Sequence, residues 1–238
     1  MPKKVMIKGN VVDDETGTFY DWFNMPSAHP SAVASVLNDG RADDEVVVDI
    51  ASNGGDVFAA SEIYTMLRNY VGPVTVNIQG LAASAASLIA MAGDKVNISP
   101  TAQIMIHKAS ANPMGNADDL SHEVTVLNGV DQSIATAYEA KTGMDAADVL
   151  QLMAKETWLT PQDAVDKGFA DEIMFADTNK PVLTNSIADI PSKNALNKFF
   201  NLVAQAQPEQ NKPVKSQPVP TLMSSKLAIL MGTNKEAN

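Results

Sequence analysis

The side chains best suited to chemistry are a serine within a run of small residues and a histidine that follows an apolar run. Residues 80–94 read GLAASAASLIAMAGD and contain two hydroxyls, Ser84 and Ser87. A serine at a turn from strand to helix faces open space, and the unpaired N–H groups of the first helical turn can bind an oxyanion. Small neighbours would let a substrate approach closely. Either hydroxyl could instead cap or back-bond a tightly packed core helix.

Two further features favour a catalytic interpretation. His107 ends the apolar run AQIMIH, and a histidine at the end of a strand can act as a base. The chain has two other histidines, His29 beside a proline and His122 on a polar helix face, and neither is as well placed. The segment SNGGD at 52–56 predicts a turn that puts a glycine pair between a strand and a helix, where backbone N–H groups can cradle an anion. A plain turn is the alternative there.

These residues must be positioned by alternating strands and helices. A β-branched run at 44–50, a helical pattern at 57–70 and an alternating run at 73–80 predict two parallel strands joined by a right-handed crossover. The small-residue stretch itself predicts a helix over 82–92 that ends at Gly93. The remaining patterns predict strands within 94–100, 102–108 and 169–175, helices over 117–141 and 146–154, and a short helix that Thr160 caps and Gly168 ends.

Composition excludes several classes of function. The 238 residues, 45% of them hydrophobic, suffice for one core with an appendage. There is no cysteine, so disulfides, thiolate metal sites and thiol nucleophiles are excluded. The net charge of −11 argues against a nucleic-acid partner. The basic start lacks a following apolar region and the run at 81–93 is too short to span a bilayer, so we expect a cytoplasmic protein without a membrane partner.

The texture of the chain changes near residue 176. The preceding part carries 10 basic and 24 acidic side chains, whereas the part from Ala176 onward carries seven lysines and four acidic residues. That second part contains an amphipathic helical pattern at 195–206 and a Pro/Gln/Lys-rich linker at 207–220. We therefore expect a folded domain over 1–175 and a largely extended C-terminal tail over 176–238, which could dock on a capsid, be cleaved off, or carry no function.

Four motifs in order resemble the Clp protease proteolytic subunit (ClpP) family, and most closely its phage and prophage head-maturation (prohead) proteases. The motifs are SNGGDVFAASEIYTML, GLAASAASLIAMAG, IMIHKA and ETWLTPQDAVDKGFADEI. The resemblance covers roughly residues 5–175 and leaves the tail out. It implies an α/β, crotonase-like fold of repeated β-β-α units with a protruding helical handle, formed here by 117–141 and 146–154.

The resemblance also implies a serine endopeptidase with a Ser-His-acid triad and no metal or organic cofactor. The family's G-x-A-A-S pattern points to Ser84 as the nucleophile, and its M-I-H pattern points to His107 as the base. The oxyanion hole would use the backbone N–H groups of Gly55 and Ala85. The third member departs from the family, because Glu156 stands where the housekeeping enzymes have aspartate. A second departure is Asn53, which replaces a proline.

The same resemblance implies partners. The family encloses its proteolytic chamber in stacked rings, so we expect a homo-oligomeric ring that acts on a peptide or protein substrate. For a phage-encoded enzyme in the host cytoplasm, that substrate would be a capsid or scaffold protein. Whether an ATPase partner feeds the chamber stays open at this point.

Three alternatives remain. A crotonase-type acyl-CoA enzyme shares the two-amide oxyanion hole. A Ser-Lys dyad would use Lys95 or Lys108 in place of His107. A catalytically silent capsid-assembly or scaffolding protein could retain the fold without activity, and the glutamate at 156 leaves room for it.

Overall fold

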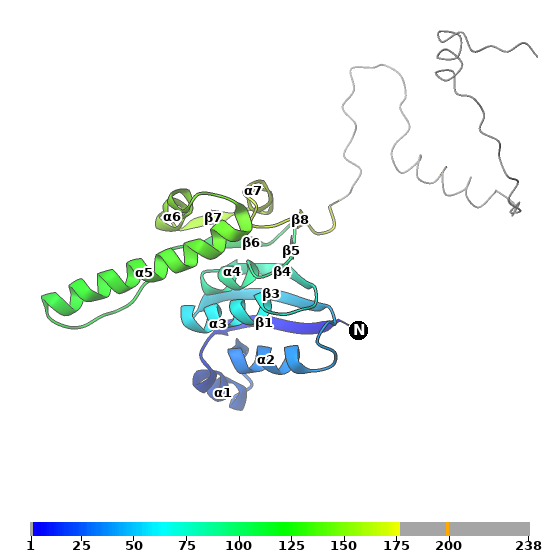
Figure 1. Cartoon of the computed structure of the whole chain (residues 1–238), viewed down its shortest axis with the longest axis horizontal. Helices are drawn as coiled ribbons and strands as arrows, with labels where there is room; N and C mark the ends of the chain where they lie inside the picture. The colour runs from blue at the N-terminus through cyan, green and yellow to red at the C-terminus, as the bar shows by residue number, and fades with distance from the viewer. Residues whose placement is uncertain (1, 177–198, 200–238) are drawn as a thin grey trace, which may run out of the picture. The chain divides into compact units, whose positions relative to one another are not determined.

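The computed structural model describes residues 2–176 and residue 199 (Figure 1). Contacts divide the chain into two units, Met1–Ala176 and Asp177–Asn238. The predicted amphipathic helix at 195–206, apart from Phe199, and the predicted linker at 207–220 lie outside the described residues. No helix in the described part of the chain is long and apolar enough to cross a membrane.

The first unit is built on an eight-stranded sheet in the order β2-β1-β3-β4-β5-β8, with β6 pairing to β4 and β7 pairing to β6. All the pairings are parallel except that of β6 with β7. The mixed α/β architecture with a parallel sheet confirms the expected fold class. The strands are β1 (Lys3–Val11), β2 (Ser27–Ala28), β3 (Val46–Gly55), β4 (Val74–Ala83), β5 (Lys95–Ile98), β6 (Gln103–Ile106), β7 (Thr157–Leu159) and β8 (Glu172–Ile173).

Seven helices connect or flank these strands in the described part of the chain. They are α1 (Asp14–Trp22), α2 (Pro30–Asn38), α3 (Val57–Arg68), α4 (Ala85–Ala90), α5 (Ala117–Thr142), α6 (Ala146–Ala154) and α7 (Pro161–Asp166). The predicted unit of two parallel strands joined by α3 is confirmed. Its inward side chains, among them Val48, Ile50, Val76 and Ile78, are fully buried in the core.

Two strands run further than the sequence predicts. β3 continues through the glycine pair, which we predicted to form a turn, because Gly54 and Gly55 still pair with the end of β1. β4 continues to Ala83, because Leu81–Ala83 pair with β6 after Thr75–Ile78 have paired with β5. The helix predicted over 82–92 is therefore only Ala85–Ala90. The end of β4 thus lies at a switch of strand partner, and in open α/β sheets ligands bind at such points, outside the carboxyl ends of the strands.

The C-terminal helices α5, α6 and α7 agree closely with the predictions. Helix α5 ends where Gly143 adopts a left-handed conformation with φ 72°, and α7 begins with a capping box between Thr160 and Asp163. The predicted strand over 169–175 shortens to the two residues of β8. The buried residues of α5 all lie in its second half, from Asp131 on, while its first half extends beyond the sheet as the expected handle (Figure 1).

Candidate active site

The site is built around the turn from β4 into α4. Ser84 occupies this turn with φ 53° and ψ −125°, a conformation that is unfavourable for a residue with a side chain. Its N–H donates to the carbonyl oxygen of Met105 at 2.9 Å, and its own carbonyl accepts the N–H of Ser87 at 2.9 Å. Backbone hydrogen bonds on both sides thus hold a strained residue with its hydroxyl pointing away from the core.

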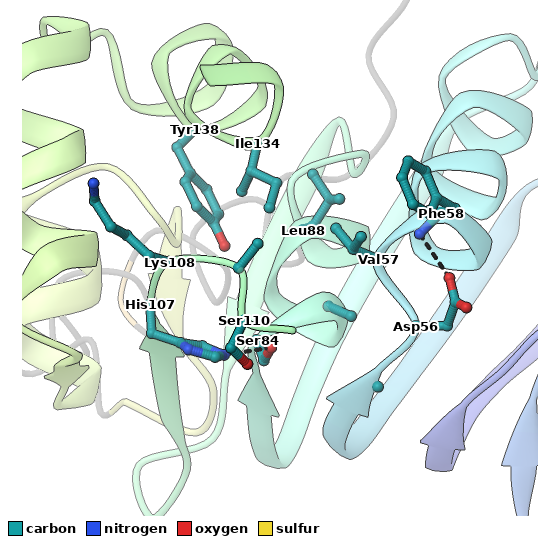
Figure 2. A pocket seen from close by; sticks show the side chains of 13 residues that line it. Asp56, Val57, Phe58, Ser84, Leu88, His107, Lys108, Ser110, Ile134 and Tyr138 are labelled. Atoms are coloured by element: carbon teal, nitrogen blue, oxygen red, sulfur yellow. Dashed lines mark hydrogen bonds between the residues drawn. The ribbon is translucent and has the colours of Figure 1, made fainter. Parts of the chain in front are cut away.

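His107 reaches Ser84 because β6 lies parallel to the end of β4. The register pairs Ala83 with Met105, so His107 leaves its strand just beyond the serine. The Ser84 Oγ and the His107 Nε2 lie 2.7 Å apart, and the dashed line in Figure 2 joins them. When the Ser84 hydroxyl donates to Nε2, the proton of the neutral ring lies on Nδ1. An imidazole so placed can remove the serine proton.

Ser87, the second hydroxyl of the small-residue stretch, is fully buried rather than exposed. Its Oγ donates to the Ser84 carbonyl at 2.6 Å and lies 2.7 Å from the hydroxyl of Tyr138. Burial raises the pKa of the Tyr138 phenol, which therefore stays protonated. Ser87 is thus a back-bonded helix serine, and Ser84 is the hydroxyl that faces the pocket.

The glycine pair contacts the serine turn directly. A Cβ atom built on Gly54 would lie 2.6 Å from the Ala83 carbonyl oxygen, 2.8 Å from the Ala85 nitrogen and 2.9 Å from the Ser84 Cβ. The N–H of Gly54 donates to the buried Ser52 hydroxyl at 3.0 Å. Gly55, not Gly54, lines the pocket together with Ala85. Glycine is therefore required at 54 so that β3 can lie close to the Ser84 turn, and the Gly54 N–H is already bonded to Ser52.

A pocket of about 280 Å³ opens beside the Ser84 hydroxyl. Figure 2 shows side chains from α3, α4 and α5 around it, with Ile134 and Tyr138 reaching in from the handle. The aliphatic and phenyl side chains of its lining are those of Val57, Phe58, Ala85, Leu88, Ala109 and Ile134. The pocket can accept an apolar group next to the nucleophilic oxygen.

Glu156, the expected third member, lies close to His107 in the backbone. The antiparallel register of β6 with β7 ends with Ile106 paired to Thr157, and His107 and Glu156 are the residues just beyond this last pair. The Glu156 side chain is exposed, and its Oε1 accepts the indole N–H of Trp158 at 3.3 Å. Within residues 2–176, the hydrogen bond to Ser84 is the one that the His107 ring makes. The β6–β7 pairing therefore places Glu156 near His107 along the backbone, but the Glu156 carboxylate does not bond to the His107 imidazole in the described part of the chain.

The remaining histidines lie outside the pocket. His29 is buried, with Nδ1 3.1 Å from Asp14 Oδ1 and Nε2 3.3 Å from Asp21 Oδ2. A hydrogen bond from the backbone N–H of Ser31 is the main reason that the pKa of Asp14 is lowered. His122 is exposed on the projecting half of α5. His29 Nδ1 also lies 3.1 Å from Ser31 Oγ, but Ser84 and His107 are the serine–histidine pair that lines the pocket.

The two lysines of the Ser-Lys alternative have acidic partners. Lys95 Nζ lies 2.8 Å from Glu172 Oε1, and Lys108 Nζ lies 3.4 Å from the buried Asp131 Oδ2. Both ammonium groups are thus paired with carboxylates rather than with the Ser84 hydroxyl, whose partner is His107. Across residues 2–176 and 199, no cluster of three or more histidine, aspartate or glutamate side chains could hold a metal ion.

Three residues of the site were not predicted from the sequence. Ser52 supports the glycine pair, Tyr138 contacts Ser87, and Asp131 binds the segment after His107. The periodicity of α5 does not predict that its second half is covered, so nothing along the chain indicated that Asp131 is buried. Tyr138 and Asp131 act through contacts that are distant in sequence, whereas Ser52 bonds Gly54 two residues away.

The fold and the site define an α/β protein with a serine–histidine site at a strand-to-helix turn. The family model described as Clp protease matches residues 28–177, which is more than half of the chain. The chain therefore belongs to the Clp protease family, and this membership supports a peptidase.

Curated relatives agree with the family. The chain is 28% identical over 141 residues to an ATP-dependent Clp protease proteolytic subunit of Deinococcus radiodurans, covering 58% of this chain and 69% of the relative. It is 30% identical over 135 residues to an ATP-dependent Clp protease proteolytic subunit 1 of Chlamydia abortus, covering 55% and 70%. A Bacteroides fragilis relative with the first of these names is 27% identical over 133 residues, covering 55% and 64%.

Proposed function

We propose that this protein is a serine endopeptidase in which Ser84 is the nucleophile and His107 the general base. The observation that carries the proposal is the 2.7 Å separation of Ser84 Oγ and His107 Nε2 at the mouth of a pocket. His107 takes the serine proton as Oγ attacks the peptide carbonyl carbon, and then gives that proton to the leaving amine. Water hydrolyses the resulting acyl-enzyme in the reverse sequence of proton transfers.

The backbone N–H groups of Gly55 and Ala85 are proposed to bind the oxyanion. Both residues line the pocket beside Ser84, and Ala85 is the first residue of α4, whose N–H has no partner within the helix. Since the N–H of Gly54 is bonded to Ser52, the second glycine is the better donor. Loss of one such donor costs about 10²–10³-fold in kcat in other enzymes.

Glu156 is proposed to orient the His107 ring through Nδ1. The support is that Glu156 and His107 are the residues just beyond the last pair of the β6–β7 ladder. Its carboxylate must leave the Trp158 indole to make this bond, and both side chains are exposed enough to rotate. Replacing Glu156 by Ala should lower kcat, while Glu156→Gln should lower it less. Wild-type kcat in Glu156→Ala would remove Glu156 from the mechanism.

The substrate is proposed to be a protein that presents an apolar side chain next to the scissile bond. The apolar lining by Val57, Leu88 and Ile134 supports this preference. Fluorogenic peptides that differ only in this side chain test it: leucine or methionine should give a higher kcat/KM than aspartate or lysine. Equal values for the four peptides would contradict the proposed role of the pocket.

Labelling with a fluorophosphonate probe tests the nucleophile. The wild-type chain should be labelled on Ser84, and Ser84→Ala should abolish both labelling and peptide cleavage without changing the far-ultraviolet circular dichroism spectrum. Ser110→Ala is the matched control, because Ser110 lines the same pocket. It should retain labelling. An unlabelled wild-type chain, or peptide cleavage that persists in Ser84→Ala, would refute the assignment and return the silent scaffold or the acyl-CoA enzyme to consideration.

The assembly of the protein and the delivery of its substrate are proposed by analogy with the relatives. We propose a homo-oligomeric ring in which the projecting half of α5 makes contacts between subunits. Its exposed Leu120, Val124 and Val126 support this, since exposed apolar side chains grouped on one element commonly mark an interface. The relatives' name contains "ATP-dependent", so adding a Clp ATPase should accelerate degradation of an unfolded protein more than that of a short peptide. A monomer by native mass spectrometry would contradict the ring.

A capsid or scaffold protein as substrate, in the phage head-maturation branch, is a proposal that rests on the sequence motifs. Co-expression with a candidate capsid or scaffold protein should yield a shortened product that is missing with Ser84→Ala. Intact-mass measurement before and after incubation reports at the same time whether the chain trims its own tail. An uncleaved candidate partner beside an enzyme that cleaves peptides would contradict that substrate and leave the peptidase intact.

A further inference from the structure

One face of the handle helix contacts both catalytic segments. Asp131 and Tyr138 are two helical turns apart on α5, and each binds a segment that carries one member of the Ser84–His107 pair. We propose that Asp131 and Tyr138 are positioning residues that together set the distance between the serine hydroxyl and the histidine ring. This inference rests on the proposed function for its kinetic consequences, but the geometry can be tested without activity.

Tyr138 acts on the serine. Its side chain is fully buried, and its hydroxyl lies 2.7 Å from Ser87 Oγ. Ser87 has a single hydroxyl proton, which it donates to the Ser84 carbonyl oxygen at 2.6 Å. The Tyr138 hydroxyl must therefore be the donor to Ser87. A chain of two hydrogen bonds thus runs from α5 to the backbone of the nucleophile.

The strained backbone at Ser84 explains why these two hydrogen bonds are needed. A non-glycine residue with φ 53° persists only where its surroundings over-determine its conformation. The Ser84 carbonyl accepts the N–H of Ser87 and the Ser87 hydroxyl at once, and Tyr138 fixes the orientation of that hydroxyl. Without the Tyr138 donor, the serine turn has one constraint fewer.

Asp131 acts on the histidine. Its carboxylate is 4% exposed, although buried carboxylates are costly unless they are paired. Oδ1 accepts the backbone N–H of Ala109 at 2.8 Å, and Oδ2 lies 3.4 Å from Lys108 Nζ. These two partners directly follow His107. Asp131 therefore determines where the chain turns after β6 and hence where the imidazole stands.

Because both residues belong to one rigid helix, their effects are coupled. Seven residues of helix span about 10.5 Å, which bridges the serine segment and the histidine segment. Ile134 lies between them on the same face and lines the pocket. Any shift of α5 would move both ends of the Ser84–His107 hydrogen bond. Proper seating of the handle is thereby linked to the geometry of the catalytic pair.

Point variants with matched controls test the proposal. Tyr138→Phe removes one hydroxyl, and Asp131→Leu removes both contacts of the carboxylate while keeping its approximate volume. Each should lower kcat and the fluorophosphonate labelling rate about tenfold, equivalent to about 1.4 kcal/mol, with KM changed less than twofold. Asp131→Asn keeps an acceptor for Ala109 and should lose about threefold.

The control variants remove equivalent contacts elsewhere. Tyr70→Phe deletes a tyrosine hydroxyl that donates to the Asp44 carbonyl at 2.8 Å. Asp94→Asn alters a carboxylate that accepts the Val74 N–H at 2.9 Å and lies 3.8 Å from Arg68. Neither Tyr70 nor Asp94 lines the pocket, and both variants should keep wild-type kcat and labelling. A general loss of stability would lower activity in the controls as well.

A spectroscopic readout separates this proposal from the proposed function. With three histidines in the chain, the His107 ring signals can be assigned by NMR from His107→Gln. In Tyr138→Phe and Asp131→Leu they should move toward their positions in Ser84→Ala, as the hydrogen bond weakens. If the wild-type chain is not labelled, the peptidase assignment fails, and these shifts still decide the positioning role.

Two results would overturn the positioning role. One is wild-type kcat and labelling in folded Tyr138→Phe and Asp131→Leu when the wild-type chain is active. The other is His107 signals that stay at their wild-type positions in both variants. If Asp131→Leu does not fold, wild-type kcat and His107 signals in Asp131→Asn would count against Asp131 in the same way.

Discussion

Replacing Gly54 by alanine should damage the active site, because its Cβ would press directly on the turn that carries Ser84. A Cβ on Gly54 would lie 2.6–2.9 Å from atoms of Ala83, Ser84 and Ala85, whereas real Cβ contacts lie at 3.4–4 Å. The serine turn must therefore retreat by about 0.5–0.8 Å. The φ of Gly54 is +91°, so any side chain there is strained as well.

The magnitude follows from these two effects. A side chain in a sparsely populated backbone region costs about 1–3 kcal/mol, and overpacking of a well-packed core costs about 1–3 kcal/mol more. The free energy of unfolding should thus fall by about 2–6 kcal/mol. A misplacement of about 1 Å in a catalytic group can cost about 10²-fold in rate, so we expect a loss of this order in the labelling rate of Ser84.

Gly80→Ala is the matched control. Gly80 belongs to the G-x-A-A-S motif and lies in β4, yet a Cβ built on it has no neighbour within 4 Å. Urea unfolding monitored by circular dichroism gives the stability of each variant, and fluorophosphonate labelling of the folded fraction gives the reactivity of Ser84. Equal labelling rates and stabilities in the two alanine variants would refute the argument that Gly54 is required for close approach to the nucleophile.

Three further changes have defined outcomes. Ser52→Ala removes a buried hydroxyl that donates to the Gly9 carbonyl at 2.6 Å and accepts from Gly54, so the free energy of unfolding measured in urea should fall by about 1–3 kcal/mol; an unchanged midpoint would contradict this. Gly143→Ala puts a side chain at φ 72° with no steric contact, and thermal unfolding should show a loss of about 1–2 kcal/mol with kcat unchanged. Hydrogen bonds from the Thr160 side chain and backbone hold the pKa of Asp163 below its ordinary value of 3.8. The contribution of Asp163 to stability is therefore present above pH 3.8 and is lost as pH falls through the folded-state pKa. The stability difference between wild type and Asp163→Asn should shrink on acidification, and a difference that grows would refute this direction.

The elements that the sequence predicted best are those with strong local signals. Helix α6 was predicted with its observed bounds, and the end of α5 at Gly143 and the start of α7 at Thr160 follow from capping chemistry that involves only neighbouring residues. Ser84 and His107 were singled out from residue type, position and motif. Their proximity in the structure comes from the pairing of β4 with β6.

The predictions that differed from the structure depended on pairing at a distance. The helix expected from Ala82 begins at Ala85, because β6 draws Leu81–Ala83 into the sheet. The glycine pair was expected to be a turn and is strand, because β1 still pairs with it. In both cases a partner strand outweighs the local preference of small residues, which fit helix and strand alike.

The sequence by itself determined the family, most elements from β3 onward and the candidates for nucleophile and base, because each depends on residue type and short-range spacing. Only the tertiary structure decided that Ser87 is buried, that the Glu156 carboxylate binds the Trp158 indole, and that Asp131 and Tyr138 of α5 contact the segments next to His107 and Ser84. Those facts depend on which surfaces of distant elements meet, and no local pattern along the chain carries that information.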